Sequence, residues 1–180
     1  ADAMPEAERL WDELTGAQTN NRNDRLQPDA VTYSTLIRGY ANQGNISRAE
    51  ELFQSMKDKG PTPTVESFNQ VLYAYSKSSL PGRAEEMLRL WCDDMHEPVR
   101  PDVRSFNTVL HALSKNSDPS SILRAERLLK RMPVRDATSC ATFVNLCCRL
   151  PGQLALDATE RALEAATDDA DVTVDAAMVA

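Results

Sequence analysis

The stretch SFNQVLYAYSK at residues 67–77 returns 38 residues later as SFNTVLHALSK at residues 105–115, with three of eleven positions changed. Self-similarity at a fixed period is the signature of a repeat architecture. A second phrase follows each copy, as PGRAEEMLRLW at 81–91 and as ILRAERLLKRM at 122–132. Two phrases therefore alternate, and the repeating unit is a pair of elements.

Both phrases occur once more upstream, as VTYSTLIRGYANQG at 31–44 and ISRAEELFQSM at 46–56. In each copy, apolar residues recur at spacings of three and four, as in Phe68, Val71 and Leu72, which predicts amphipathic helices. The period-two alternation of a half-buried strand does not occur in these phrases. The predicted fold class is therefore all-α.

Signals for helix starts and turns favour helical hairpins. A proline precedes the first helix of each unit and is followed by a possible N-cap residue, in the pairs Pro28 and Asp29, Pro63 and Thr64, and Pro101 and Asp102. Turn-forming residues separate the two helices at 42–45, 78–82 and 116–121. Small residues stand where the helices of a hairpin would approach most closely, at Ala49, Ala84 and Ala125. We predict a right-handed α-α solenoid of stacked hairpins.

Weaker copies extend this register in both directions. MPEAERLWDEL at 4–14 resembles a second helix without its first, residues 137–150 and 153–166 resemble a fourth hairpin, and VTVDAAMV at 172–179 resembles the start of a fifth. The expected organisation is an incomplete repeat with a linker at 1–29, repeats at 30–64, 65–102 and 103–136, a degenerate repeat at 137–170, and an acidic tail or truncated fifth repeat at 171–180. The array is expected to continue beyond both ends.

Composition argues against several classes of protein. The 180 residues are 42% hydrophobic and carry a formal net charge of −7, so the chain does not bind nucleic acid by charge alone. No apolar run is long enough for a transmembrane helix, and no secretory leader is visible. The four cysteines, at 92, 140, 147 and 148, have no Cys-x-x-Cys spacing. We therefore expect no membrane contact and no metal site.

The segment VTYSTLIRGYANQGNISRAEELFQSMKDKGPTP at 31–63 resembles a repeat of the pentatricopeptide repeat family, and the repeat period near 35 residues fits the same family. The tetratricopeptide family has a similar period, but its Trp, Leu-Gly and Tyr signature is not present in the first helix. The resemblance implies a solenoid that binds single-stranded RNA with one base per repeat.

The family resemblance also implies which residues contact the bases. The main reader follows the aromatic position, and the second reader is the last residue of the unit. Carried onto this sequence, the reading pairs are Ser34 with Thr64, Asn69 with Asp102, and Asn107 with Asp136, and the base-packing positions are Val31, Glu66 and Arg104. The family pattern implies uracil, favoured over cytosine, at both Asn–Asp units and gives no firm base for Ser34 with Thr64.

The chemistry of these residues leaves alternatives open. A carboxamide offers both a donor and an acceptor to a pyrimidine edge, and a neighbouring carboxylate can orient it. Asp102 and Asp136, however, could equally cap helices, or do both. Glu66 would repel phosphate unless a residue such as Arg104 neutralised it. Tyr33, Phe68 and Phe106 are predicted to be core residues, and the lysines at 57, 77 and 115 either touch phosphates or are solvated.

No phosphate loop, zinc-protease helix, nucleophile elbow or deaminase signature occurs, so we expect neither an enzyme nor a cofactor or small-molecule substrate. The expected partners are single-stranded RNA and, as a further possibility, proteins. The alternative function is a helical-repeat scaffold for proteins within an organellar ribosome or RNA-processing complex. Location in a mitochondrion or chloroplast, and a role in organellar RNA metabolism, are implied by the family resemblance alone.

Overall fold

The computed structural model describes residues 4–16, 28–93, 99–116, 118–150 and 152–162. Its helices are α1 (Met4–Gly16), α2 (Ala30–Gln43), α3 (Ile46–Lys59), α4 (Val65–Lys77), α5 (Pro81–Asp93), α6 (Val103–Ser114), α7 (Ser120–Arg131) and α8 (Ala137–Arg149). Residues 153–162 are also helical. These ranges contain no strand, and the predicted all-α class is confirmed. The suggested repeat start at 172–179 lies outside the described residues.

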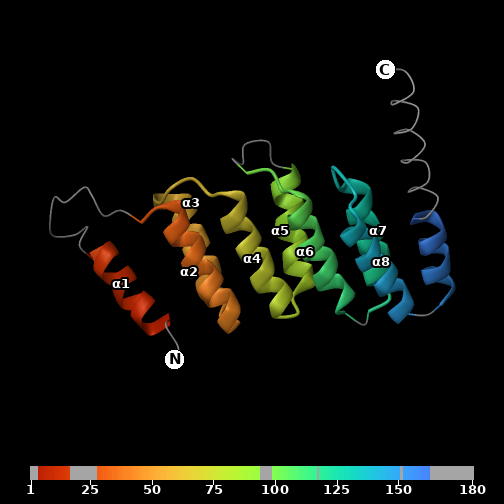
Figure 1. Ribbon diagram of the computed structural model, residues 1–180, viewed down its shortest axis with the longest axis horizontal. Coiled ribbons are helices and arrows are strands. Elements are labelled where there is room, and N and C mark those ends of the chain that lie inside the picture. Colours follow the sequence, from red (N-terminus) through yellow and green to blue (C-terminus); the bar gives the residue numbers. More distant parts are fainter. Residues whose placement is uncertain (1–3, 17–27, 94–98, 117, 151, 163–180) are drawn as a thin grey trace, which may run out of the picture.

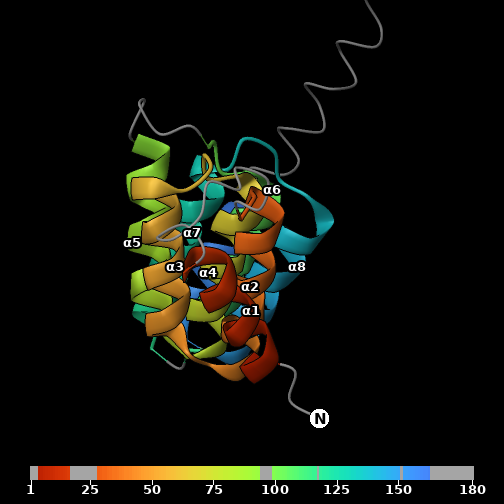
Figure 2. The same ribbon diagram turned by 90° about the vertical axis from the view of Figure 1, so that its left-hand side faces the viewer.

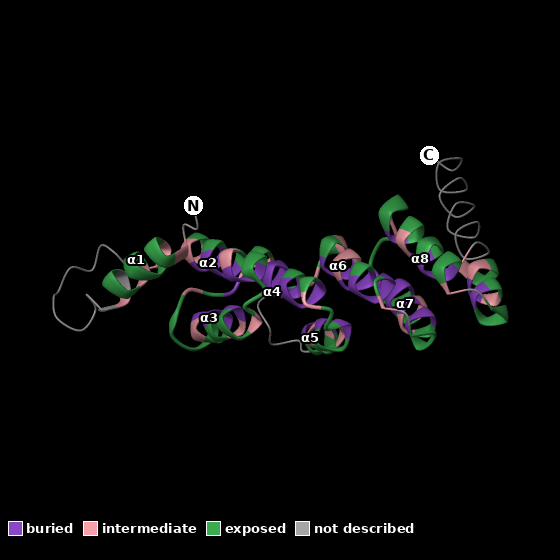
Figure 3. Cartoon of the chain, turned by 90° about the horizontal axis from the view of Figure 1, so that it is seen from below, coloured by how far each residue is buried: buried purple, intermediate pink, exposed green. Residues whose placement is uncertain are grey.

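The helices form two layers along one elongated stack (Figures 1 and 3). The first helices of the hairpins, α2, α4, α6 and α8, lie side by side in one layer, and α3, α5 and α7 form the other. Figure 2 looks along the stack and separates the layers. We call them the inner layer (α2, α4, α6, α8) and the outer layer (α3, α5, α7). This arrangement is the predicted solenoid of hairpins.

Each inner helix begins at a residue whose side chain caps it. Asp29, Thr64, Asp102 and Asp136 have extended backbones, and each accepts a hydrogen bond from a backbone N–H in the first turn. The first hairpin turns at Gly44, whose φ of 76° lies in the left-handed region that glycine adopts readily. The Pro-Asp and Pro-Thr signals thus mark the helix starts correctly.

The core lies between the two layers. Phe68 is fully buried and Phe106 is 2% exposed, as predicted for the aromatic positions. Ala49, Ala84 and Ala125 are 0% exposed, so these small residues do lie in the interior. Trp91 of α5 joins neighbouring hairpins, because its ring centroid lies 5.5 Å from that of Phe53 on α3 and 4.7 Å from that of Phe68 on α4.

Helix α1 is attached to α2 by the same kind of contact that joins α3 to α4. The hydroxyl of Tyr40 donates to Glu8, and the hydroxyl of Tyr75 donates to Glu50. Trp11 packs edge-on against Tyr33, with ring centroids 4.8 Å apart. In these contacts, α1 resembles α3, the second helix of the first hairpin.

A ladder of ion pairs runs along the outer layer. Arg83 lies 3.5 Å from Glu50, Arg124 lies 2.6 Å from Glu85, and Arg161 lies 3.0 Å from Glu126. Each pair joins the Arg-Ala-Glu phrase of one unit, or its counterpart at Arg161, to the preceding unit. The sequence repeat displays these residues, but the pairing between successive hairpins was not predicted from it.

The ladder is expected to make stability depend on pH through Glu126. Hydrogen bonds from Arg161 and then Lys130 lower the pKa of Glu126 from its usual 4.5 to about 2, although burial opposes the shift. A lowered pKa stabilises the folded protein above the usual pKa, and this contribution is lost as the pH falls from 4.5 toward 2. Because Arg161 and Lys130 are exposed, solvent screens their interaction with Glu126. We therefore expect the free energy of unfolding to fall by about 1–2 kcal/mol through Glu126 across this pH range, as measured by urea unfolding.

The matched variants are Glu126→Gln and Glu86→Gln, because Glu86 is exposed on α5. Glu126→Gln should make the acid dependence of unfolding shallower, and Glu86→Gln should leave it as in wild type. Identical pH profiles for these two variants would contradict the assignment to Glu126.

Two further classes of feature are absent from the parts of the chain described by the structure. No helix there is long and apolar enough to cross a membrane. The His, Cys, Asp and Glu side chains in these segments also form no group that could hold a metal ion. The cysteines are free and range from buried Cys147 to exposed Cys140 and Cys148.

Candidate functional site

The N-caps of the inner helices place carboxylates at one end of the inner layer. Asp102 Oδ1 accepts from the backbone N–H of Ser105 at 2.8 Å, and Asp136 Oδ1 accepts from that of Ser139 at 2.7 Å. In return, each serine hydroxyl accepts from the N–H of its cap residue, which completes a capping box. The carboxylates are therefore held rigidly at the starts of α6 and α8.

Each of these carboxylates also meets an asparagine on the preceding inner helix. Asn69 Nδ2 on α4 donates to Asp102 Oδ1 at 3.3 Å. Asn107 Nδ2 on α6 donates to Asp136 at 3.2 Å and 3.0 Å, one distance to each carboxylate oxygen. Asp102 and Asp136 thus cap a helix and orient a carboxamide at the same time. The structure brings together both Asn–Asp pairs named from the sequence.

The third predicted pair is not joined in this way. Ser34 is 9% exposed, and its hydroxyl donates to the carbonyl oxygen of Ala30 at 2.7 Å. The Thr64 hydroxyl accepts from the backbone N–H of Ser67 at 3.2 Å. Among the described residues, no hydrogen bond links Ser34 to Thr64, because both hydroxyls are used within their own helices.

The three base-packing positions differ in environment. Val31 is 71% exposed at the start of α2. Glu66 and Arg104 lie on neighbouring inner helices, and Arg104 Nη1 is 3.4 Å from Glu66 Oε2. The positive charge expected to offset Glu66 is therefore present, although both side chains are exposed and such a pair is weak.

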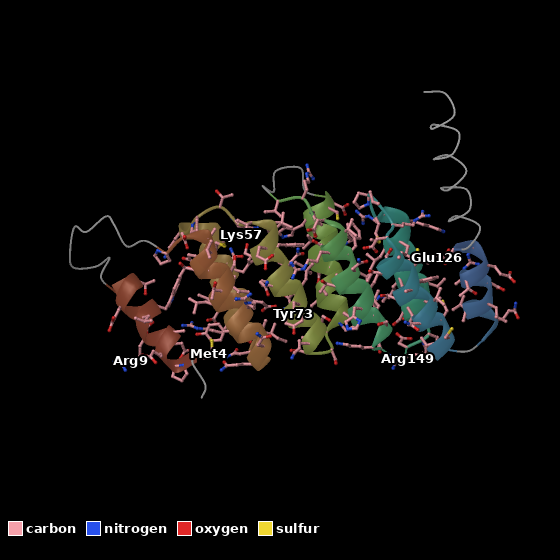
Figure 4. All side chains as sticks on the ribbon, in the orientation of Figure 1. Met4, Arg9, Lys57, Tyr73, Glu126 and Arg149 are labelled. Atoms are coloured by element: carbon pink, nitrogen blue, oxygen red, sulfur yellow. The ribbon has the colours of Figure 1, made fainter. Side chains whose placement is uncertain are left out.

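A groove of about 690 Å³ opens along α4, α6 and the start of α8 beside the Asn–Asp pairs. It is lined by Tyr73, Ser76, Asp102, Val103, Arg104, Asn107, Thr108, His111, Asp136 and Thr138. Figure 4 labels Tyr73 on α4. Side chains from three successive inner helices thus face one surface, which we call the inner groove.

The electrostatics of the inner groove follow from its hydrogen bonds. Burial raises the pKa of Asp102, but the backbone N–H and hydroxyl of Ser105, with Asn69, outweigh burial and keep that pKa below its usual value. The backbone N–H of Ser139 is the largest cause of the lowered pKa of Asp136. Burial, with the charge on Lys115, lowers the pKa of His111. At neutral pH the groove therefore presents two carboxylates, the guanidinium of Arg104 and a neutral imidazole.

Comparison with known proteins agrees with this architecture. A family model described as "Pentatricopeptide repeat domain" matches residues 18–78, and a second model, described as "PPR repeat", matches residues 66–94. In the crystal structure of the pentatricopeptide repeat protein PPR10 from maize, a region superposes on 93% of this chain with a TM-score of 0.63 and 23% identity. Residues 18–94 of this chain therefore carry pentatricopeptide repeats.

Relatives of this pentatricopeptide repeat protein include organellar proteins. The mitochondrial 15S rRNA processing factor CCM1 of Yarrowia lipolytica is 40% identical over 52 residues, which are 29% of this chain and 7% of the relative. A mitochondrial pentatricopeptide repeat-containing protein of Arabidopsis thaliana is 29% identical over 97 residues, 52% of this chain and 22% of that protein. The chain thus spans a small part of these relatives, and their compartments bear out the expected location in a mitochondrion or chloroplast.

Residues of the site that were not named from the sequence include Tyr73 and His111, which line the groove, and the buried Ser105 beside Asn69. Tyr73 and His111 each follow the aromatic position of their unit by five residues, so continuing the register would have found them. Ser105 was also missed, although its hydroxyl lies 2.6 Å from the carboxamide oxygen of Asn69. One residue considered for phosphate contact is placed elsewhere, since Lys57 lies over the Trp91 ring, 5.1 Å from its centroid, beside the outer layer.

Proposed function

We propose that this pentatricopeptide repeat protein binds single-stranded RNA along the inner groove, one base per hairpin, in organellar RNA processing. The observation that carries the proposal is the Asn–Asp pair, which recurs at the same place on successive inner helices. The proposed one-base units are 30–64, 65–102 and 103–136, followed by a degenerate unit at 137–170. One relative is a mitochondrial 15S rRNA processing factor, which is consistent with this role.

The chemistry of the pair suits a base edge. Asp136 accepts from Asn107 Nδ2, which carries a second hydrogen. The buried Asn107 Oδ1 has no partner among the described residues, and a rotation of the side chain would present it to a ligand. Donor and acceptor then stand side by side, as they do on a pyrimidine edge. The carboxylate has no proton to donate at neutral pH, so its effect on selectivity acts through the carboxamide that it orients.

The proposed base-packing surfaces are apolar or neutralised. Val31 offers an exposed aliphatic side chain, and the Glu66–Arg104 pair offers the flat guanidinium of Arg104. Lys77 and Lys115 are exposed at the ends of α4 and α6, where their ammonium groups are available to phosphates. Because the protein has a net charge of −7, we expect these phosphate contacts to contribute less to RNA affinity than the contacts with the bases do.

Fluorescence anisotropy with short RNAs tests the proposal. The probes carry a UU, CC or AA pair within one adenine-rich background, and the salt concentration is kept low so that binding is measurable. We expect wild type to bind the UU probe about tenfold more tightly than the CC or AA probe. The double variant Asn69→Ala with Asn107→Ala should lose this preference. Its helicity, measured by circular dichroism, should be unchanged.

Gln54→Ala is the matched control, because it removes an exposed carboxamide from the outer layer. This variant should bind RNA as wild type does. Absence of RNA binding by wild type at low salt would overturn the proposal and favour the alternative, a helical-repeat scaffold for proteins. Catalysis is no part of the proposed function.

A further inference from the structure

The two Asn–Asp pairs share residue types but differ at the carboxamide oxygen. Asn69 is 5% exposed, and its Oδ1 accepts a hydrogen bond from the Ser105 hydroxyl at 2.6 Å. Asn107 Oδ1 is buried and has no hydrogen-bond partner among the residues that the structure describes. One acceptor is thus already occupied within the protein, and the other is unsatisfied.

The difference arises from two serines at equivalent positions. Ser105 and Ser139 are both fully buried, and each is the third residue of an inner helix within a capping box. The Ser105 hydroxyl faces Asn69 Oδ1 at 2.6 Å and Asp102 Oδ1 at 2.9 Å. The Ser139 hydroxyl instead donates to the carbonyl oxygen of Asp136 at 2.7 Å. Ser105 therefore reaches back to the preceding hairpin, and Ser139 stays within its own cap.

A buried acceptor without a donor is unfavourable and is satisfied in native proteins by a protein group, a water or a ligand. Asn107 lines the inner groove, and because its Oδ1 is buried, a rotation of the side chain is needed to present this oxygen to a donor from that side. A base edge that carries an N–H beside an acceptor, as uracil does, would satisfy both Asn107 Oδ1 and the free hydrogen on Nδ2. At Asn69 the same edge would compete with Ser105 for the oxygen.

We propose that base selectivity is concentrated at Asn107, and that Ser105 is a positioning residue that weakens base reading at Asn69 by holding its carboxamide oxygen. This inference rests on the proposed function. It states that base selectivity differs between two units that are alike in sequence. It replaces the expectation of two equivalent uracil readers. The ligand class at Asn107 is an unpaired pyrimidine with an N–H on its Watson–Crick edge.

The test uses four RNAs in the same adenine-rich background, carrying UU, UA, AU or AA. For wild type, we expect one of the two single replacements to weaken binding about tenfold and the other at most about twofold. Asn107→Ala should abolish the larger effect, which identifies the base at that unit. Ser105→Ala should make the two effects similar by freeing Asn69.

Ser139→Ala is the matched control, since it removes an equally buried cap hydroxyl that makes no hydrogen bond to a carboxamide. It should destabilise the fold as Ser105→Ala does and keep the asymmetry. In the free protein, the Asn69 side-chain amide resonances should shift in Ser105→Ala and stay in place in Ser139→Ala. This second readout requires no RNA.

The outcomes separate the two proposals. No RNA binding by wild type overturns the proposed function together with this inference. Uracil-selective binding with equal effects at both positions, or an asymmetry that survives Ser105→Ala, overturns the inference and leaves the proposed function standing. An unchanged Asn69 amide resonance in Ser105→Ala also overturns the role of Ser105.

Discussion

Phe68→Ala is expected to lower the free energy of unfolding by about 3–5 kcal/mol. Phe68 is fully buried on α4, and its ring packs against Trp91 at a centroid distance of 4.7 Å. The neighbours belong to fixed helices on both layers, so they cannot close the cavity completely. Urea unfolding followed by circular dichroism measures the loss.

Tyr73→Ala is the matched control for this prediction. Tyr73 lies on the same helix but is 38% exposed, so removal of its ring leaves no closed cavity. We expect Tyr73→Ala to lower the free energy of unfolding by much less than Phe68→Ala does. Equal losses in the two variants would show that Phe68 does not have the interior role assigned to it.

Trp91→Ala should be similarly destabilising, by about 3–5 kcal/mol, and should also reduce cooperativity. Trp91 is 5% exposed and contacts Phe53 on α3 and Phe68 on α4 from its place on α5. In a solenoid, each hairpin is stabilised chiefly by its neighbours, so loss of an interface lets the parts unfold separately. In urea unfolding, we expect both the midpoint concentration and the m-value to be lower than in wild type.

Leu90→Ala provides the comparison for Trp91→Ala, because Leu90 is the preceding residue and is 51% exposed. Its m-value should match wild type. If Trp91→Ala lowered the midpoint with an unchanged m-value, the ring would contribute stability without coupling the hairpins.

RNA binding should respond differently to these two core variants and to the groove variants. Neither Phe68 nor Trp91 lines the inner groove, so residual folded protein should keep its base preference. Asn107→Ala should lose the base preference and cost far less stability than the core variants, because it removes the Nδ2 hydrogen bonds to Asp136 and no core side chain. Stability and selectivity are therefore separable in this fold.

Much of the fold could be predicted from local signals. The aromatic and aliphatic spacing of the first phrase identified α4 and α6, and the Pro-Asp dipeptide located the start of α6. These signals succeed because helix formation and capping depend on residues a few positions apart. The Arg-Ala-Glu ladder escaped prediction because its partners lie in different hairpins, as in the pair of Arg124 with Glu85.

The candidate site was predictable in part. The family register named Asn69 with Asp102 and Asn107 with Asp136, and the structure joins each pair by a hydrogen bond. The same register named Ser34 with Thr64, whose hydroxyls instead bond within their own helices. A serine hydroxyl has a short reach and a nearby backbone carbonyl as competitor, and the longer carboxamide of asparagine extends to the next helix.

The repeat period, the hairpins, the buried aromatic positions and the places of the two carboxamides follow from the amino-acid sequence. The difference between these carboxamides appears only in three dimensions, where Ser105 contacts Asn69 and Asn107 Oδ1 has no partner among the described residues. The reason is physical: both serines occupy the same register position, but a hydrogen bond forms or fails over a few tenths of an ångström. The two hydroxyls meet different acceptors, Asn69 of the preceding helix for Ser105 and the carbonyl of Asp136 for Ser139, and contacts between hairpins are not specified by local sequence.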